Sequence, residues 1–414
     1  MENVSSSNGL EKRPKLRFPG FDEPWKATAF GDIVHEFSNR TKVEDEDVLL
    51  SAAIEGMFLN TELFGHQRGA SNKGYKKIKY GTMVLSTQNL HLGNANVNQR
   101  FEHGMVSPAY KTYDISGCSI DLIAQWIKSD AAKRFFYNAT TVGASVCRRN
   151  VEWDTLYGQS LFLPSLPEQE KIANLLTLLS NRIEEQRQLI IALKKYKRGL
   201  SNSLFDRLSA ESESQLCIFG DMMTILQNNT FSRDNLSVGG NGVRNIHYGD
   251  VLIKYGAVLD LHSENVPVIN AEQDISKFSA LSYLRNGDVV FADTAEDYTV
   301  GKSTEIIGAE NIAALSGLHT IPCRPQGSFA PMYLGYYFNS DYFKKQFYPM
   351  IQGTKVSSIS KSEIIKTKII VPCLQEQARI SSIMSALDDR IDAAKHTTKD
   401  LIDLRSGLLQ QLFI

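Results

Sequence analysis

The chain repeats part of itself at a fixed distance. The stretch PSLPEQEKIANLLTLLSNRIEEQ, which begins at Pro164, aligns without a gap with PCLQEQARISSIMSALDDRIDAA, which begins at Pro372, 208 positions later. The same offset still relates Gly199 to Gly407. Because self-similarity at a fixed period is the signature of a repeated structural unit, the chain should fold as two equivalent halves.

Both copies predict a long helix, because apolar residues recur at alternating steps of three and four. Each helix can run for about 38 residues, or roughly 57 Å. Helices of this length need a partner, and two equivalent halves pack most simply about a pseudo-twofold axis, which makes the helices antiparallel. The expected seam consists of Ile172, Leu176, Leu179, Ile183, Ile190, Leu193 and Leu200 in the first helix, and of Ile380, Met384, Leu387, Ile391, Leu401 and Leu408 in the second.

The charges on the two helices agree with antiparallel packing. In that arrangement Lys194 and Lys195 would lie near Asp388 and Asp389. An alternative is that the charged flanks only solvate two separate amphipathic helices.

A block of mixed pattern precedes each helix, with short apolar alternations, Gly and Asn turns and one or two helical stretches. FGDI at 30–33 opens one block and FGDM at 219–222 opens the other. We therefore expect an α+β fold in which two α/β domains form a pseudo-twofold repeat joined by two long antiparallel coiled-coil helices. The expected boundaries are 1–165 for the first domain, 166–208 for the first helix, 209–372 for the second domain and 373–414 for the second helix.

Composition is that of a folded protein and gives no sign of a membrane or a metal. Apolar residues make up 42% of 414 residues, and no uncharged apolar run reaches the length of a membrane span. The start of the chain lacks the apolar stretch of a signal peptide, so we expect a cytoplasmic protein. The five cysteines form no CxxC pair and the eight histidines no ligand-spaced cluster, so we expect no metal.

The first block is locally basic, although the formal net charge of the chain is −1. Between Arg68 and Arg149 there are twelve Lys or Arg against four Asp or Glu, interleaved with tyrosines. Such a stretch is typical of DNA binding through phosphate neutralisation, although a solvated lysine-rich face looks similar. The candidate contacts are Lys73, Tyr75, Lys76, Lys77, Arg100, Ser145, Arg148 and Arg149.

The second block differs, with thirteen basic and fifteen acidic residues between 216 and 372. Its candidate DNA contacts follow predicted strands or lie in loops, where the same residues could simply confer solubility. They are Lys254, Tyr255, Tyr298, Lys302, Lys355 and Ser357.

No catalytic signature is present. Val300-Gly301-Lys302-Ser303 resembles the end of a phosphate-binding loop, but Glu296 stands where that loop requires a glycine. The [ND]PP[YF], GxSxG and HExxH motifs are absent as well. We therefore expect a chain without catalysis of its own.

Four segments in order resemble the specificity subunit of a type I restriction-modification system. They are PKLRFPGFDEPWKATAFGDI near the start, the junction LPEQEKIANLL before the first long helix, LSGLHTIPCRP at 315–325, and the second EQARI helix. The resemblance covers nearly the whole chain. It implies that each block reads one half of a bipartite double-stranded DNA target, and that the helix pair sets the gap between the halves.

The resemblance also implies partners. Two adenine methyltransferase subunits and motor-nuclease subunits would assemble with this chain. S-adenosylmethionine, Mg²⁺ and ATP would belong to those subunits, and this chain would hold no cofactor. Two other interpretations are a coiled-coil protein-binding scaffold and an orphan subunit that guides methylation only.

Overall fold

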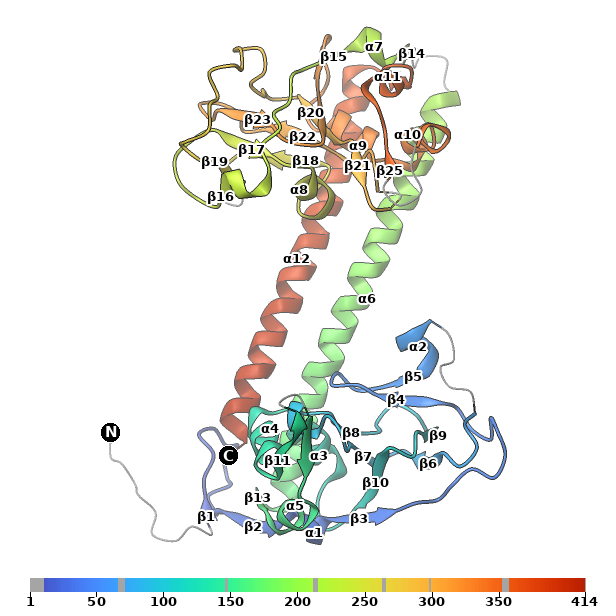
Figure 1. The fold of residues 1–414 in the computed structure, drawn as a ribbon, viewed down its shortest axis with the longest axis vertical. Coiled ribbons are helices and arrows are strands. Elements are labelled where there is room, and N and C mark those ends of the chain that lie inside the picture. Colours follow the sequence, from blue (N-terminus) through green and yellow to red (C-terminus); the bar gives the residue numbers. More distant parts are fainter. Residues whose placement is uncertain are drawn as a thin grey trace. The chain divides into compact units, whose positions relative to one another are not determined.

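The computed structural model describes residues 11–65, 71–145, 148–210, 215–262, 266–297, 299–351 and 357–413. The chain divides into two compact units, which we describe separately. The first unit comprises Met1–Arg187 and His396–Ile414, and the second comprises Gln188–Lys395. Two long helices, α6 (Leu166–Ala210) and α12 (Leu374–Leu412), each contribute a stretch to both units (Figure 1).

The first unit is built on antiparallel sheets with helices packed beside them. The order of its largest sheet is β3 (Val34–Phe37), β10 (Tyr110–Ile115), β7 (Met83–Ser86) and β8 (Ala95–Val97). A second sheet has β2 (Trp25–Ala29) between β1 (Glu11–Lys12) and β13 (Ser160–Leu163). The helices are α1 (Phe30–Ile33), α3 (Ile120–Trp126), α4 (Asp130–Asn138) and α5 (Trp153–Gly158).

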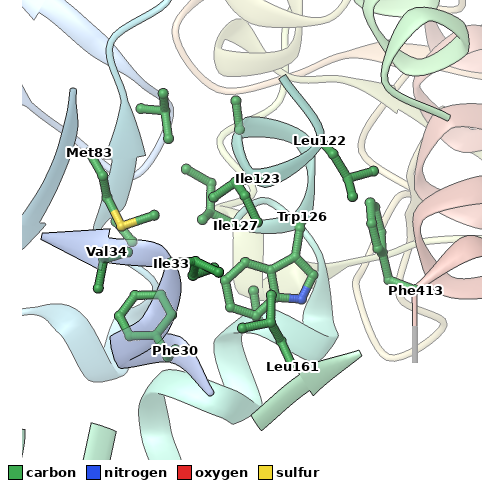
Figure 2. Packing of buried hydrophobic residues seen from close by; sticks show 14 of the residues in the cluster. Phe30, Ile33, Val34, Met83, Leu122, Ile123, Trp126, Ile127, Leu161 and Phe413 are labelled. Atoms are coloured by element: carbon green, nitrogen blue, oxygen red, sulfur yellow. The ribbon is translucent and has the colours of Figure 1, made fainter. Parts of the chain in front are cut away.

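The main core of this unit joins its sheet, its helices and the end of α12. Figure 2 shows the buried Trp126 ring among Ile33, Leu161 and Phe413, the residue that follows α12. Ser119 and Ser129 begin α3 and α4 as N-caps, because each hydroxyl accepts a hydrogen bond from a backbone N–H of the first turn.

A second, smaller core of the first unit involves two strand pairs and is formed by Leu50, Met57, Ile78 and neighbouring apolar residues. The strands are β4 (Leu50–Ala52) with β5 (Met57–Leu59), which leads into α2 (Asn60–Phe64), and β6 (Lys76–Lys79) with β9 (His103–Val106). A separate hairpin consists of β11 (Thr140–Ser145) and β12 (Arg148–Val151).

The second unit has a five-stranded sheet in the order β15 (Met223–Ile225), β24 (Thr320–Pro325), β20 (Val289–Ala292), β22 (Ser303–Ile307) and β18 (Val258–Asp260). A four-stranded sheet follows the order β16 (Leu236–Ser237), β19 (Val268–Ile269), β17 (Arg244–Ile246) and β23 (Ala314–Ser316). Two strand pairs complete the unit: β14 (Gln215–Ile218) with β26 (Lys368–Val371), and β21 (Thr294–Ala295) with β25 (Ser357–Ser358).

The helices of the second unit pack an aromatic core. They are α7 (Phe219–Met222), α8 (Tyr248–Ile253), α9 (Tyr333–Phe338), α10 (Asp341–Lys344) and α11 (Lys361–Ile364). The rings of Phe291, Phe338 and Phe343 lie together, with Phe291 and Phe338 5.0 Å apart. Among the residues that the structure describes, no helix has both the length and the apolar character needed to cross a membrane.

The FGD repeat has the same structural role in each unit. The N–H of Phe30 donates to the carbonyl of Gln159 (2.8 Å), and the N–H of Phe219 donates to that of Thr367 (2.7 Å). The following glycine lies against backbone in both cases, since a Cβ on Gly220 would come 3.2 Å from the carbonyl oxygen of Ile365. The two units therefore share one plan, as the repeat predicted.

The long helices pack antiparallel in each unit. In the first unit Ile172 and Leu176, early in α6, share a core with Leu409 and Leu412, late in α12. In the second unit the roles reverse, because Phe205 and Leu208, late in α6, pack with Ile380 and Met384, early in α12. The predicted α+β fold with an antiparallel helix pair is confirmed.

The predicted seam residues are all buried or half-buried. Ile172, Leu176, Ile183, Leu193, Ile380, Met384, Leu387 and Ile391 are buried, and Leu179, Ile190, Leu200, Leu401 and Leu408 are half-buried. One electrostatic detail differs from expectation. Asp388 forms an ion pair with Lys197, which lies three residues after Lys194 and two after Lys195, the predicted partners.

Candidate nucleic-acid interface

Strand β6 and the loop before it carry four of the predicted contacts, with very different surroundings. Lys73 is exposed and Tyr75 is half-buried. Lys77 pairs with Glu46 at 2.7 Å. Lys76 is buried, and its Nζ donates to the carbonyl oxygen of Tyr110 (2.7 Å). Burial lowers the pKa of Lys76, which makes it a structural lysine that a DNA phosphate would not reach without rearrangement.

Arg100 is exposed but already forms an ion pair with a carboxylate of the same chain. Its guanidinium donates two hydrogen bonds to the carboxylate of Glu62 (2.8 and 2.7 Å) and lies 4.9 Å from the ring of Phe101. The arginine holds the pKa of the Glu62 carboxyl below its usual range. Bidentate pairs of this kind are the strong form of a charge-assisted hydrogen bond, so a phosphate would have to compete with Glu62 for Arg100.

The β11–β12 hairpin carries the remaining predicted contacts of the first unit. Arg149 is half-buried, donates to the side chain and carbonyl of Thr140 (both 2.7 Å), and stacks 4.2 Å from the ring of Tyr137. Ser145 and Arg148 face each other across the hairpin next to its tip. The tip itself and the side chains of Ser145 and Arg148 lie outside the described part of the structure.

The stretch from Arg68 to Arg149 carries less free positive charge than its sequence suggests, because carboxylates from an earlier part of the chain pair with its cations. The segment 44–47 folds onto β6 and β9, where Glu46 meets Lys77 and Asp47 meets the ring of His103 at 2.7 Å. Glu62 reaches Arg100 in the same way. Counting charges between Arg68 and Arg149 misses these carboxylates, because they lie before Arg68 and more than thirty residues from the cations that they neutralise.

Two cations beside β6 were missed by the sequence analysis. Arg40 and Lys42 are exposed. The backbone of Arg40 forms an isolated antiparallel β-bridge with that of Lys76, and its guanidinium donates a hydrogen bond to the carbonyl of Gly74 (3.1 Å). Within the described part of the chain, neither Arg40 nor Lys42 pairs with a carboxylate through its side chain, and the same holds for Lys73. We call Arg40, Lys42 and Lys73 the β6 cluster. Backbone hydrogen bonds between residues 40–41 and 74–76, rather than closeness in the sequence, bring these cations together.

In the second unit the end of α8 gathers three predicted contacts. Lys302 is half-buried and its Nζ donates to the carbonyl of Leu252 (2.9 Å), while burial lowers its pKa. Lys254 is exposed and pairs with the buried Asp250 at 3.0 Å. Tyr255 is buried, and its hydroxyl has no hydrogen-bond partner among the described residues. Lys254 is thus the most accessible of the three.

The other predicted contacts of the second unit lie near β25. Ser357 begins this strand and is half-buried, paired with Ala295 of β21. Tyr298 and Lys355 lie outside the described residues.

A polar surface group of the second unit was also missed. His319 has a positive φ of 54° and packs edge-on against Tyr248, with ring centroids 5.3 Å apart. Its Nδ1 lies 3.4 Å from Asp293. A positive φ in a non-glycine residue is uncommon and marks a constrained turn. The only available signal was the LSGLHTIPCRP segment itself.

No three His, Cys, Asp or Glu side chains in the described ranges are grouped as a metal site would require. The site is therefore a set of cations, hydroxyls and aromatic rings on two α/β units that share a plan and differ in surface. The protein therefore belongs to the class of binding proteins in which a repeated scaffold carries two different polar surfaces.

Comparison with known proteins identifies the class further. Residues 219–403 match the model of the type I restriction modification DNA specificity domain. The chain is 22% identical to the type I restriction enzyme MjaVIII specificity subunit of Methanocaldococcus jannaschii, over 100% of this chain and 95% of that protein.

Solved structures share the fold over nearly the whole length of the chain. The S subunit of a type I restriction-modification system from M. genitalium superposes with a TM-score of 0.55 at 14% identity, covering 97% of this chain and 99% of that one. A chain from a structure of complex assembly in the type I R-M system gives a TM-score of 0.56 at 16% identity, covering 95% and 98%.

The match of residues 219–403 to the model of DNA specificity domains confirms the resemblance to a type I specificity subunit. The predicted function in DNA sequence recognition is confirmed with it.

Proposed function

We propose that each unit reads one half of a bipartite DNA sequence and that the chain thereby directs adenine methylation and restriction by partner subunits. The observation that carries this proposal is the presence of two α/β units with the same internal plan. Equivalent positions on these units carry different side chains, as two readers of two different half-sites would require.

The turn before the central strand illustrates this difference. In the first unit β10 pairs with β7, with Tyr113 opposite Met83, and in the second unit β24 pairs with β20 in the same way, with Cys323 opposite Val289. Counting back from these pairs, Ala109 of the first unit corresponds to His319 of the second. One turn is thus apolar and the other carries a half-exposed imidazole that can donate and accept hydrogen bonds.

The β6 cluster supplies the phosphate contacts that we propose for the first unit. Arg40, Lys42 and Lys73 are exposed, and lysine and arginine make most contacts to the DNA backbone. Tyr75, Arg149 and the β11–β12 hairpin complete the surface that we propose there. In the second unit we propose Lys254, Ser357 and His319.

The partners that we propose are two methyltransferase subunits, which bind S-adenosylmethionine, and motor-nuclease subunits, which use Mg²⁺ and ATP. The setting is the cytoplasm, where chromosomal DNA is accessible. Support for assembly with partners comes from the relatives, all described as parts of type I systems.

The helix pair would act as the spacer between the two readers. Readers joined by stiff helices can engage DNA together only when their half-sites are a matching number of base pairs apart. The helices α6 and α12 are continuous over 45 and 39 residues, which favours this role.

The test is modified-base sequencing of cells that carry this chain and its methyltransferase, compared with cells lacking only this chain. We expect a split motif, adenine-methylated on both strands, that disappears with the deletion. An unchanged set of methylated motifs, with the methyltransferase still expressed, would contradict the proposal and favour a protein-binding scaffold.

A further inference from the structure

The same pocket is built twice, once in each unit, by equivalent residues of the two long helices. The pocket of the first unit has a volume of about 360 Å³, and its helix residues are Ser180, Ile183, Arg187, Ile402, Arg405 and Ser406. The pocket of the second unit, about 320 Å³, includes Asp388, Ile391, Lys395, Lys194, Lys197 and Arg198. Each helix residue of the first pocket has its counterpart 208 positions away in the second.

One cation in the lining of each pocket connects the helix pair to a helix of the adjoining α/β domain. Arg405 donates to the hydroxyl of Ser180 (2.9 Å) and to Oε1 of Gln125 in α3 (2.8 Å). Its counterpart Lys197 pairs with Asp388 and lies 4.9 Å from the ring of Tyr336 in α9. The repeat thus preserves the position of the cation while the partners around it change.

Both pockets have more cations than anions. In the first, Lys128, Arg187 and Arg405 face one carboxylate, Glu55. The two hydrogen bonds of Lys128 go to neutral oxygens of Ile54 and Asn96, and burial, with Arg405 nearby, lowers the pKa of this lysine to about 8.

In the second pocket, the four cations Lys194, Lys197, Arg198 and Lys395 face two carboxylates, Asp341 and Asp388. Beside the pockets, Glu184 pairs with Arg187 and Asp392 pairs with Lys395. With these carboxylates counted, each pocket still has one more cation than anions.

We propose that each pocket receives an acidic side chain, an Asp or Glu carboxylate, from a partner subunit, so that the two pockets bind two copies of one partner in the same manner. This inference rests on the proposed function, which assigns methyltransferase subunits to the chain. It adds the site and the chemistry of their attachment.

Three observations favour a protein carboxylate as the occupant. Where the first pocket has Ser180, the repeat places Asp388, which already bonds the central cation of the second pocket. The pockets have room for a few side chains, and duplex DNA, whose major groove alone is about 12 Å wide, is too broad to enter them. Ile183 and Ile391 give the walls an apolar part, as in the core of a protein interface.

Charge reversal at the exposed lining cations tests the proposal. Arg187 and Lys395 are 208 positions apart, and their side chains are 57% and 53% exposed, so Arg187→Glu and Lys395→Glu should leave the fold intact. The full chain is co-purified with its methyltransferase subunit, and native mass spectrometry gives the number of bound copies. Each single variant should retain one copy, and the double variant should lose both, with an affinity reduced by at least about tenfold.

The matched control is Arg182→Glu with Arg390→Glu, which share the 208 offset but do not line the pockets. Two copies bound to the double pocket variant at unchanged affinity, or an equal loss in the control, would overturn the inference. So would weaker DNA binding by a pocket variant that keeps both copies, because the pocket would then hold a DNA phosphate. A wild-type chain that binds no methyltransferase at all would overturn the proposed function as well.

Discussion

Gln169 and Gln377 make the same two hydrogen bonds at equivalent places in the two units. Nε2 of Gln169 donates to the carbonyl of Pro164 (2.8 Å), and its Oε1 accepts from the N–H of Ser119 (2.7 Å). Nε2 of Gln377 donates to Pro372 (2.8 Å), and its Oε1 accepts from Ala330 (2.9 Å). Each glutamine is buried and ties the first turn of a long helix to the segment that leads into α3 or α9.

Replacing Gln169 by Leu should destabilise the first unit. The substitution keeps a similar volume, but the half-buried N–H of Ser119 and the buried carbonyl of Pro164 lose their hydrogen-bond partner. We expect the free energy of unfolding to fall by about 2–4 kcal/mol, as measured by urea denaturation. The control is Glu170→Gln, a substitution at the exposed neighbouring residue. If the Gln169→Leu chain were as stable as this control, the two hydrogen bonds of Gln169 would contribute nothing to the free energy of unfolding.

The sequence predicted this framework well because its signals are local and repeated. The three-and-four spacing of apolar residues predicts each helix on its own, and the offset of 208 makes the two helices equivalent. The EQ dipeptide recurs because Gln169 and Gln377 have the same two hydrogen bonds to make. None of this requires knowledge of how distant segments pack.

The candidate site was harder to predict because charge partners are distant in sequence. Glu46 lies 31 residues from Lys77, and Glu62 lies 38 from Arg100, so the basic stretch looked more cationic than it is. Lys76 points into the interior because strand alternation sends it to the opposite side from Lys77. The hydrogen bond from Arg405 to Gln125 also left no signal in the sequence, because Gln125 and Tyr336, which contact the two equivalent cations, are 211 residues apart instead of 208.

Removing the β6 cluster should weaken DNA binding in a salt-dependent way. For the complex with the methyltransferase, we expect Lys73→Ala to lower affinity for all sequences alike and to reduce the slope of log affinity against log salt by about 0.9. Adding Arg40→Ala and Lys42→Ala should enlarge both effects. Fluorescence anisotropy over a salt series measures them. Lys15→Ala, at an exposed lysine elsewhere, is the control, and equal slopes for all variants would exclude these residues from the interface.

Glu305 should make stability depend on pH near neutrality. Its buried carboxylate accepts hydrogen bonds from the N–H groups of Met332 (2.6 Å) and Gly335 (2.8 Å), and burial raises its pKa to about 7. The folded chain therefore holds this proton more tightly than the unfolded chain does. The free energy of unfolding should fall by about 3 kcal/mol as pH rises from about 4.5 to about 7.

Glu305→Gln should remove this part of the pH dependence, as measured by denaturation between pH 5 and pH 8. Glu170→Gln should keep it. If the Glu305→Gln and wild-type curves ran parallel over this range, the carboxyl of Glu305 would not titrate there.

The central claim is that two readers are held at a set distance by the helix pair, and lengthening the helices tests it most directly. One heptad is inserted after Ile183 and one after Ile391, which keeps the apolar seam in phase and adds about 10 Å to each helix. In modified-base sequencing we expect unchanged half-sites and a spacer longer by about three base pairs, given 3.4 Å per base pair. An active complex that methylates the original motif with the original spacer would contradict it.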